Sequence, residues 1–431
     1  MKHLLPIEGR LALACLLPVT ALTSCASSLG HGASRAHAHA FIDYWGPTKP
    51  SGHTRLAVKD LIDMKGVVTS AGSEYLWKHA EPAKKDAKCL AGARARGVDI
   101  VGKTNLTEFA VSVSGMNAYF GTPRNRLDHK HNYVPGGSSS GSAVAVASGR
   151  ADVAFGTDTA GSIRVPAACC GILGLKTTFG LVPLDGVFPI SPEHLDTVGP
   201  MARTMPRLVE GMDLLKPGFS AKYAAAVAAK PSARQIRIGR LYVEGTDPEI
   251  DKSVDAALEK SHFKVVRLSD DFRDKWMQAQ KDGITVALAD TWLHDKDFVG
   301  KGGVSTKTVA TIILGRIEYP GNYSEALSRL RAWQRELRRA FRQVDFIALP
   351  TLKTPPARMP RLIGGSFFEL DLVGRQNTQA VNFAGNPALA APVPMTGDKP
   401  SVPVTSIQLV GPRLSEAELL NAGRLLETKR D

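Results

Sequence analysis

The sequence predicts an α/β fold in which a central mixed β-sheet is surrounded by α-helices in a single large domain. Of the 431 residues, 43% are hydrophobic, which is enough to bury a large core and too apolar for a mostly disordered chain. From about residue 50, short strand patterns are followed by helix-prone stretches. No internal repeat or long low-complexity linker interrupts this order. We therefore expect one domain over residues 51–431.

The amino-terminal residues 1–24 are predicted to be a signal peptide rather than part of the fold. Lys2 and Arg10 precede an apolar run from Leu11 to Leu22. Its 12 residues suit a signal-peptide core and are too short for a membrane-spanning helix, which needs about 20.

The segment "LTSC", which ends at Cys25, resembles the lipobox of bacterial lipoproteins. In that motif the signal is cut before the cysteine and the thiol carries lipid. The resemblance implies lipidation at Cys25 and an exported protein, periplasmic or anchored in the outer membrane as a lipoprotein. Residues 25–50 would then form a flexible tether. Ordinary secretion with a free Cys25 is the alternative.

The strand and helix patterns follow one another along the rest of the chain. Three early strands are expected within "RLAVKDLI", "GVDIVGKTN" and "ADVAFGTD". Further on, "IRIGRLYV", "DPEIDKSVDAALEK" and "FKVVRLSD" predict a strand, helix, strand unit, with Asp247 as helix cap and Pro248 as first helical residue. A long helix from about Ser324 to Gln343 then leads into the strand "VDFIALPT".

The charge and the cysteines exclude some functional classes. The formal net charge is +13, but Lys and Arg are dispersed, and their densest cluster, "RLRAWQRELRRAFR", is typical of a helix with a solvated basic face. We therefore expect no nucleic-acid partner. The cysteines Cys89, Cys169 and Cys170 lack metal-ligand spacing, and they are expected to be small core residues, with no metal bound.

The stretch "GVDIVGKT", residues 97–104, formally matches a phosphate-binding loop. In such a loop the four residues between the glycines form a turn. Here they are Val98, Asp99, Ile100 and Val101, which favour a strand. Nucleotide binding is therefore not expected, and Lys103 is interpreted as structural.

A Gly/Ser tract, "VPGGSSSGSAVAVASG", spans residues 134–149. It is not interpreted as a linker, because a helix-prone run at 143–147 and a buried strand at 151–155 follow it directly. The serines therefore lie at the amino terminus of a helix, where unpaired amides favour negative charge. At this point helix capping and catalytic chemistry are equally good interpretations.

A second serine loop lies in "TAGSIRVPAACCG", which predicts a tight turn after a strand and a helix that begins near Pro166. The backbone amides of Thr159, Ala160, Gly161 and Ser162 can converge there on an oxyanion. The loop lacks the G-x-S-x-G spelling of a nucleophile elbow, and no histidine is well placed as its base. A nucleophilic Ser162 therefore needs another base.

Several strings together resemble the amidase signature family over nearly the whole chain from about residue 50. They include "AVKDLIDMKGVVTSAGS", "GKTNLTEFA", "GGSSSGSAVAVASG", "GTDTAGSIRVPAACCGILGLK" and "LDTVGPMART". "DFIALPT", "NFAGNPALAAPVP" and "SIQLVGPRLSE" match its later segments. The resemblance implies the amidase-signature fold and an amidohydrolase of linear amides that uses a Ser, cis-Ser, Lys triad.

Carried over onto this chain, the triad would be Lys59 of "AVKD", Ser138 of "GGSSS" and Ser162 of "GSIR". The two serines are 24 positions apart (162 − 138), which is the family's spacing and favours Ser138 over its neighbour. The resemblance also implies structural roles around the nucleophile loop. Four residues would have such supporting roles: Ser139, Thr157, Asp158 and Arg164.

The chemistry of this triad is coherent. Lys59 must be neutral to accept a proton, which requires its pKa to fall from about 10.4 to about 7 by desolvation. The adjacent Asp60 would oppose this, but on a strand the two side chains point to opposite faces. Ser138 can donate to Lys59 while it accepts from Ser162. A small-molecule amide would be hydrolysed through an acyl-enzyme without any cofactor.

One departure from the family pattern and several alternatives remain. Ala160 stands where the family most often has glycine. Because alanine is poorly tolerated at positive φ, Ala160 is expected to have a negative φ. The alternatives are esterase or aryl-acylamidase activity on the same triad, a catalytically silent, lipid-anchored binding protein, and the glutaminase-like subunit of a tRNA-dependent amidotransferase. The predicted signal peptide argues against the last. Residues 265–320 carry no motif, and neither the substrate nor the oligomeric state is predicted.

Overall fold

The computed structural model describes residues 37–49, 52–127, 130, 132–360, 366–397 and 400–426. The predictions of a signal peptide over residues 1–24 and of lipidation at Cys25 lie outside these residues.

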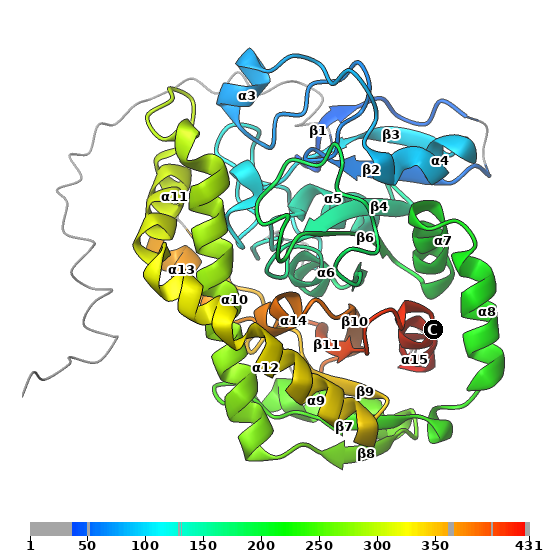
Figure 1. The fold of residues 1–431 in the computed structure, drawn as a ribbon. Coiled ribbons are helices and arrows are strands. Elements are labelled where there is room, and N and C mark those ends of the chain that lie inside the picture. Colours follow the sequence, from blue (N-terminus) through cyan, green and yellow to red (C-terminus); the bar gives the residue numbers. More distant parts are fainter. Residues whose placement is uncertain are drawn as a thin grey trace, which may run out of the picture.

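One mixed β-sheet runs through the middle of the molecule (Figure 1). Its strands are Phe41–Tyr44 (β1), Arg55–Lys59 (β2), Asp99–Thr104 (β3), Val153–Asp158 (β4), Leu173–Lys176 (β5), Thr197–Ala202 (β6), Arg237–Arg240 (β7), Lys264–Arg267 (β8), Phe346–Pro350 (β9), Ala388–Pro394 (β10) and Val404–Val410 (β11). Their order across the sheet is β1-β3-β2-β4-β6-β5-β10-β11-β9-β7-β8. β2 is parallel to β3 and β4, whereas β4 is antiparallel to β6. The predicted fold class is confirmed.

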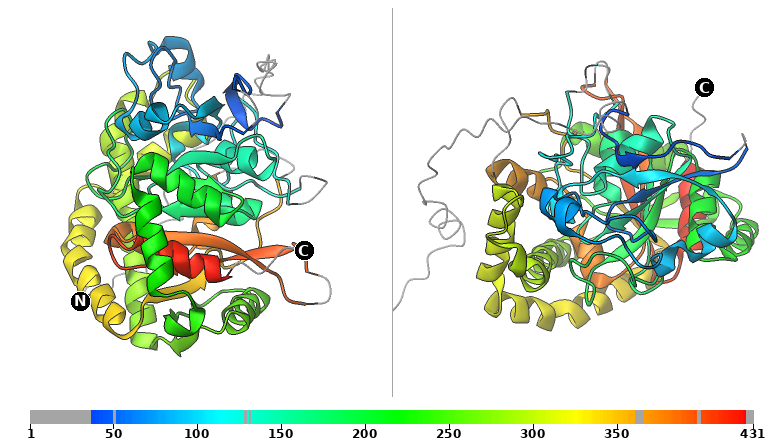
Figure 2. Two further views of the ribbon diagram at one scale, coloured as in Figure 1. Left: turned by 90° about the vertical axis from the view of Figure 1, so that its right-hand side faces the viewer. Right: turned by 90° about the horizontal axis from the view of Figure 1, so that it is seen from above.

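Helices surround the sheet, as the views in Figures 1 and 2 show together. They are Glu74–His79 (α3), Ala91–Ala95 (α4), Ser140–Ala147 (α5), Arg164–Cys170 (α6), Met205–Leu215 (α7), Phe219–Ala229 (α8), Pro248–Lys260 (α9), Asp270–Asp295 (α10), Thr306–Glu318 (α11), Gly321–Gln343 (α12), Ser366–Gly374 (α13), Gln379–Ala384 (α14) and Glu416–Leu426 (α15). α7 packs on β4 and β6, and α15 packs on β10.

The alternation of side chains along β2 decides which face of the sheet carries the lysine. Leu56 and Val58 belong to the apolar core that includes residues of α7, whereas Ala57 belongs to the core formed with α5 and α6. Successive side chains on a strand point to opposite faces. Lys59 therefore shares the face of Ala57 and points toward α5 and α6.

Most locally predicted elements are present. β2, β3 and β4 occupy the three early strand patterns, and β7, α9 and β8 form the predicted strand, helix, strand unit with parallel strands. The side chain of Asp247 accepts a hydrogen bond from the backbone N–H of Glu249, as expected for the cap of α9. The predicted long helix is α12, which begins three residues earlier than expected.

The apparent phosphate-loop sequence is the strand β3, as expected from its residues. Lys103 is fully buried, forms an ion pair of 3.0 Å with Asp60, and donates to the carbonyl of Ile62. Its amine is therefore engaged inside the protein, which agrees with a structural role. The cysteines Cys89, Cys169 and Cys170 are also buried and free of disulfides.

The predicted tether over residues 25–50 is wrong for its second half. β1 pairs antiparallel with β3, and Phe41 is completely buried. The aromatic rings of Phe41 and Tyr44 lie 4.7 Å apart between their centres. These side chains bury apolar surface that would otherwise face water, so the folded domain includes residues 37–49.

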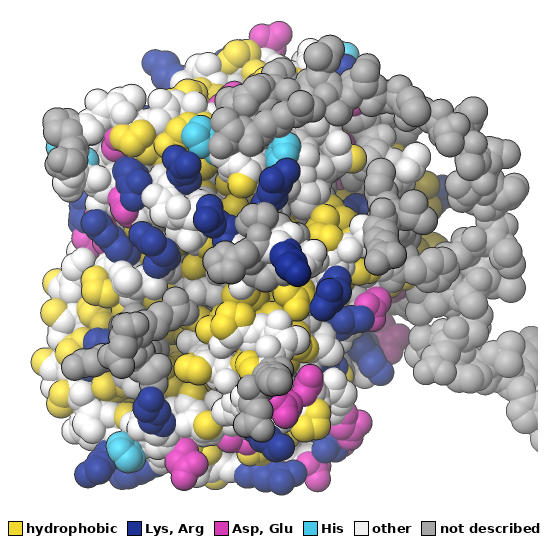
Figure 3. All heavy atoms as spheres, turned by 180° about the vertical axis from the view of Figure 1, so that it is seen from behind, with side chains coloured by type: hydrophobic (Ala, Val, Ile, Leu, Met, Phe, Trp, Pro, Cys, Tyr) yellow, Lys and Arg dark blue, Asp and Glu magenta, His cyan; other side chains and the backbone are white. Residues whose placement is uncertain are grey.

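The segment without motif, residues 265–320, forms mainly α10 and α11. α10 contacts α11, α12 and α14. In Figure 1, α10 and α11 lie along the left side of the molecule. No helix of the described residues is long and apolar enough to cross a membrane. On the face shown in Figure 3, Lys and Arg side chains are interspersed with hydrophobic and uncharged groups.

Candidate active site

Lys59 lies at the end of β2 and is fully buried. Its Nζ donates to Ser138 Oγ at 2.7 Å and to Thr157 Oγ1 at 2.8 Å. Burial lowers the pKa of Lys59 to about 7, although the negative charges of Asp158 and Asp196 work against this change. Near neutral pH, Lys59 is therefore an uncharged amine in a large fraction of the molecules, and this amine can accept a proton.

The adjacent carboxylate is turned away from this amine. Asp60 pairs with Lys103 and accepts hydrogen bonds from the backbone N–H and the hydroxyl of Ser70. Burial raises the pKa of Asp60, and the Lys103 charge partly offsets that rise. The prediction that Lys59 and Asp60 face opposite sides is confirmed.

Ser138 follows a cis peptide bond at Gly137–Ser138, as the resemblance implied. Its carbonyl accepts the backbone N–H groups of Thr107 at 3.2 Å and Ser140 at 2.9 Å. A Cβ placed on Gly137 would lie 2.8 Å from the backbone nitrogen of Gly115, so only glycine fits there. The Gly/Ser tract is thus a tightly packed loop inside the fold.

The serines of this tract do not act as side-chain caps. Ser139 occupies the cap position of α5, but its side chain makes no capping hydrogen bond. Its hydroxyl donates instead to the carbonyl of Thr157 at 3.3 Å, and its backbone N–H donates to the carbonyl of Ser162 at 3.2 Å. Ser139 and Thr157 therefore join the loops of the two serines, which is the supporting position predicted for them.

Ser162 lies on the loop between β4 and α6 and is 6% exposed. The preceding Gly161 has a φ of 129°, and a Cβ there would collide with Thr378 Oγ1. Ala160 is absent from the described non-glycine residues with positive φ, as its alanine side chain requires. Ser138 Oγ and Ser162 Oγ share no hydrogen bond in this part of the structure.

One of the four amides expected to hold an oxyanion is already engaged. The backbone N–H of Gly161 donates to Asp158 Oδ1 at 2.9 Å. The carboxylate of Asp158 turns back on its own loop and takes this donor, a local contact that the sequence pattern does not reveal. In this structure the amides of Thr159, Ala160 and Ser162 are therefore the remaining donors for an oxyanion, and the role of Gly161 stays a prediction.

A buried ion pair fixes the loop that carries Ser162. Arg164 Nη2 lies 2.8 Å from Asp158 Oδ1, and both side chains are fully buried. Burial acts to raise the pKa of Asp158, but the Arg164 guanidinium outweighs it and holds that pKa well below its usual range. Arg164 also donates to the carbonyl of Thr378 at 3.0 Å and to Gln408 Oε1 at 2.6 Å. The predicted anchoring roles are consistent with these contacts.

Sequence reasoning missed several residues that complete the site from distant parts of the chain. Thr378 Oγ1 donates to the carbonyl of Ala160 at 2.6 Å, and Asn382 Nδ2 donates to Asp158 Oδ1 at 2.8 Å. Thr159 Oγ1 donates to Asp196 Oδ1 at 2.6 Å. Asn382 and Asp196 lie in two of the sequence strings that carried the family resemblance. Comparison of those strings residue by residue with the family could have identified them.

A second buried lysine has different surroundings. Burial, followed by the nearby Arg164 charge, lowers the pKa of Lys176 to about 7. Its Nζ donates to the carbonyls of Thr177 at 2.9 Å and Asn386 at 2.8 Å. Lys176 therefore binds backbone carbonyls just after β5 and just before β10, and neither of these hydrogen bonds involves a serine hydroxyl.

Two histidines that the structure describes, His194 and His294, are paired with carboxylates. His194 Nδ1 pairs with Asp290 Oδ2 at 3.0 Å, and His294 pairs with Glu193 at 3.2 Å. Trp292 packs in an apolar cluster with Ile312. Among the described residues, no group of three or more His, Cys, Asp or Glu side chains could hold a metal ion.

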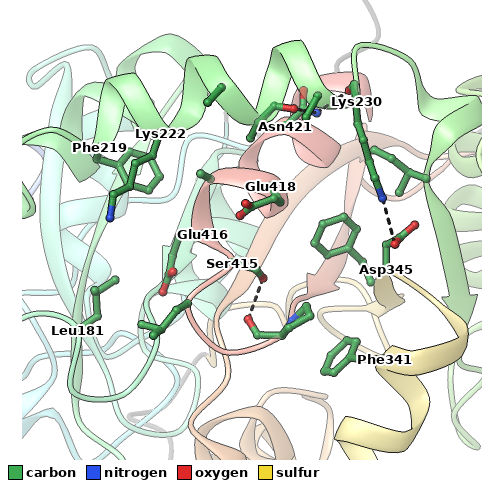
Figure 4. A pocket seen from close by; sticks show the side chains of 18 of the residues that line it. Leu181, Phe219, Lys222, Lys230, Phe341, Asp345, Ser415, Glu416, Glu418 and Asn421 are labelled. Atoms are coloured by element: carbon green, nitrogen blue, oxygen red, sulfur yellow. Dashed lines mark hydrogen bonds and ion pairs between the residues drawn. The ribbon is translucent and has the colours of Figure 1, made fainter.

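A cavity of about 760 Å³ lies between α8, α15 and the end of α12, and Figure 4 shows it from close by. Phe219, Phe341 and Phe346 line its apolar part, and Lys222 and Glu418 are among its charged residues. None of the predicted site residues line this cavity. It is therefore distinct from the cluster around Lys59.

Comparisons with known proteins agree with this geometry. The Amidase family profile matches residues 55–420. A glutamyl-tRNA(Gln) amidotransferase subunit of Halobacterium salinarum is 30% identical over 418 residues, which cover 88% of this chain and 96% of the relative.

Solved structures give the same picture. A structure described as a vestigial protein complex that reveals the origins of an s-triazine catabolic enzyme superposes with a TM-score of 0.74 and 26% identity, over 87% of this chain and 83% of that one. The corresponding glutamyl-tRNA(Gln) amidotransferase subunit of Thermotoga maritima superposes with a TM-score of 0.75 over 91% and 88% of the two chains. Its 24% identity supports the fold alone.

Proposed function

Since the chain belongs to the amidase family, enzymes that act on the C–N bonds of amides, we propose that it hydrolyses a linear carboxylic amide through Ser162, Ser138 and Lys59. The observation that carries the proposal is the bond of 2.7 Å from Lys59 Nζ to Ser138 Oγ, made by an amine whose pKa is lowered to about 7. A lysine that is neutral near pH 7 is a competent general base.

In the first step, Ser162 Oγ attacks the carbonyl carbon of the amide. The Ser162 proton passes to Ser138 Oγ while the Ser138 proton passes to Lys59 Nζ, which becomes an ammonium. The oxyanion accepts hydrogen bonds from free amides of the loop at residues 159, 160 and 162. Return of the proton through Ser138 to the leaving nitrogen breaks the C–N bond and releases ammonia or an amine.

In the second step, water attacks the acyl-enzyme. Its proton follows the same path to Lys59, the carboxylic acid is released, and Ser162 regains its hydrogen. These steps use only side chains and backbone groups of this chain. Ester hydrolysis and aryl-acylamide hydrolysis would use the same groups, since an ester or an anilide carbonyl can be attacked in the same way.

A covalent probe tests this proposal without knowledge of the substrate. An alkyl phosphonyl fluoride should phosphonylate Ser162, with loss of fluoride, because an activated serine attacks the phosphorus atom. Mass spectrometry of the digested protein should place the adduct on the peptide that contains Ser162. In the matched control Ser139→Ala the same peptide should be modified, whereas an unmodified Ser162 in the native protein would refute the proposed nucleophile.

The amidotransferase relatives support a second candidate, an amidase component that releases ammonia from glutamine within a larger enzyme. The relevant observation is the 30% identity that extends over 88% of this chain. The two candidates differ in the preferred substrate, since the second requires recognition of the charged ammonium and carboxylate of glutamine.

We further propose that the protein is exported and that lipid on Cys25 anchors it to a membrane. The support is the apolar run at residues 11–22 followed by "LTSC". Cells grown with radiolabelled palmitate should incorporate label into the native protein, and Cys25→Ser should lose it. Cys89→Ser is the matched control because Cys89 is buried. Equal labelling of the native protein and Cys25→Ser would contradict this anchor.

A further inference from the structure

A short segment, residues 376–379, lies against the loop that carries Ser162. Thr378 Oγ1 donates to the carbonyl of Ala160, and Arg164 donates to the carbonyl of Thr378. A Cβ built on Gly161 would lie 2.9 Å from Gln376 Oε1. The Gln376 carboxamide is therefore next to the residue that precedes the proposed nucleophile.

The same segment is held from its other side by α10, the main helix of the motif-free region. Gln280 Oε1 accepts the backbone N–H of Ala380 at 2.7 Å, and Gln280 Nε2 donates to the backbone carbonyl of Gln376 at 2.9 Å. Since it is tied to both α10 and the serine loop, this segment is a rigid support for its side chains.

Two glutamine side chains of this segment carry buried polar atoms without a partner. Gln376 and Gln379 are each 1% exposed. Gln376 Nε2, Gln379 Nε2 and Gln379 Oε1 have no hydrogen-bond partner among the described residues. Unpaired buried polar groups reduce stability, so each needs an explanation, such as an ordered water, an ion or a role in binding or catalysis.

The unpaired state of Gln376 does not depend on how its amide is oriented. Thr378 Oγ1 has one hydrogen, and its nearer acceptor is the carbonyl of Ala160 at 2.6 Å rather than Gln376 Oε1 at 3.1 Å. If the Gln376 amide is turned over, its nitrogen donates to Thr378 Oγ1 and its oxygen is the free atom. One end of the carboxamide remains available in both cases.

We propose that Gln376 and Gln379 are specificity residues that bind an uncharged, hydrogen-bonding group on the acyl chain of the substrate. This inference rests on the proposed hydrolysis at Ser162. A carboxamide offers both a donor and an acceptor, so the matching group is another carboxamide, a ureide or a hydroxyl. No charged side chain of the described residues hydrogen-bonds to either carboxamide, and the neighbouring Arg375 already pairs with Asp371 at 2.6 Å. A charged group bound there would lack a counter-charge.

Protection of Ser162 from an alkyl phosphonyl fluoride measures this recognition without requiring turnover. The first probe is glutaramide, which has a neutral terminal carboxamide. The second is 5-methylhexanamide, in which an isopropyl group of the same shape replaces that carboxamide. The third is L-glutamine, which carries an ammonium and a carboxylate. Glutaramide should halve the labelling rate at a concentration at least about 10-fold below that of the other two probes.

The variants Gln376→Met and Gln379→Met should remove this advantage of glutaramide while Ser162 is still labelled. The matched control is Gln334→Met, because Gln334 Nε2 donates to the carbonyl of Ala384 at 3.2 Å, at the far end of α14. This control should keep the advantage. A purely structural role of the two glutamines would instead weaken protection by glutaramide and 5-methylhexanamide equally.

Three results would overturn the inference: equal or better protection by 5-methylhexanamide, better protection by L-glutamine, or no protection by glutaramide up to its solubility limit. Failure of the native protein to be labelled at Ser162 would instead refute the proposed function. Thermal unfolding supplies a separate check, since Gln379→Met removes unpaired polar atoms and should not lower Tm. A lower Tm would show that the amide is already paired inside the protein.

Discussion

Ser162→Ala is expected to reduce the rate of amide hydrolysis by roughly 10⁴-fold or more, since it removes the atom that forms the acyl-enzyme. Ser162 contributes its backbone carbonyl to the bond with Ser139, and alanine keeps that carbonyl. The variant should therefore fold normally, and its circular dichroism and Tm should resemble those of the native protein. Release of ammonia or amine from a panel of aliphatic, aromatic, peptide-terminal and ureide amides measures the effect.

The matched control for this variant is Ser139→Ala. Ser139 lies in the same serine cluster and is fully buried, but its hydroxyl donates to a backbone carbonyl at 3.3 Å rather than to Lys59. We expect a change of less than about tenfold, because a weak neutral hydrogen bond supplies little free energy. Hydrolysis that survives Ser162→Ala would place the nucleophile elsewhere.

Lys59→Met is expected to have the second largest effect, a loss of roughly 10³-fold or more in kcat, because it removes the proposed general base. In the native enzyme, protonation of Lys59 abolishes its basicity. Since burial lowers its pKa to about 7, kcat/KM should be constant well above pH 7 and should fall as the pH drops below 7. A pH profile between 5 and 9 therefore tests the lysine directly.

Lys176→Met is the matched control for the lysine, because Lys176 is equally buried and its pKa is also lowered to about 7. Its amine contacts two backbone carbonyls and no serine hydroxyl, so the variant should keep the acid limb of the profile near pH 7. If Lys59→Met kept the acid limb of the pH profile, or if Lys176→Met lost it, the group that titrates near pH 7 would not be Lys59.

The stability of Lys59→Met separates a catalytic effect from unfolding. The pKa of Lys59 is lower in the folded protein than its ordinary value of 10.5, so the unfolded chain binds more protons between about pH 7 and 10.5. At pH values below 10.5, burial of this amine therefore reduces the free energy of unfolding. Methionine has no charge to desolvate, and we expect its variant to have a Tm at pH 7 that is not below that of the native protein.

Local patterns predicted the fold well where the interactions are local. Alternating apolar residues marked β2, β3 and β4, and Asp247 followed by Pro248 marked the start of α9. β1 was missed because it consists of four residues and is stabilised by pairing with β3, about 60 positions further along the chain. A strand stabilised by such a distant partner looks like part of a tether in the sequence alone.

The candidate site was predictable in part for the same reason. Lys59, Ser138 and Ser162 stand in motifs with characteristic spacing, and the first two are in direct contact in the structure. The engagement of the Gly161 amide and the approach of Thr378 were not predictable. Thr378 lies 218 positions from Ala160, and it reaches the loop because β10 and β11 pack against α6, where Arg164 binds the carbonyl of Thr378.

The sequence by itself determined which chemical groups are present and the approximate positions of the strands, turns and helices that form through local interactions. It supplied a lysine at the end of a strand and two serines in glycine-containing loops. The tertiary structure decided how those groups behave. Desolvation arises from burial between segments that are distant in the chain, and this burial lowers the pKa of Lys59 to about 7 while the pairing of Asp60 with Lys103 keeps a neighbouring charge away.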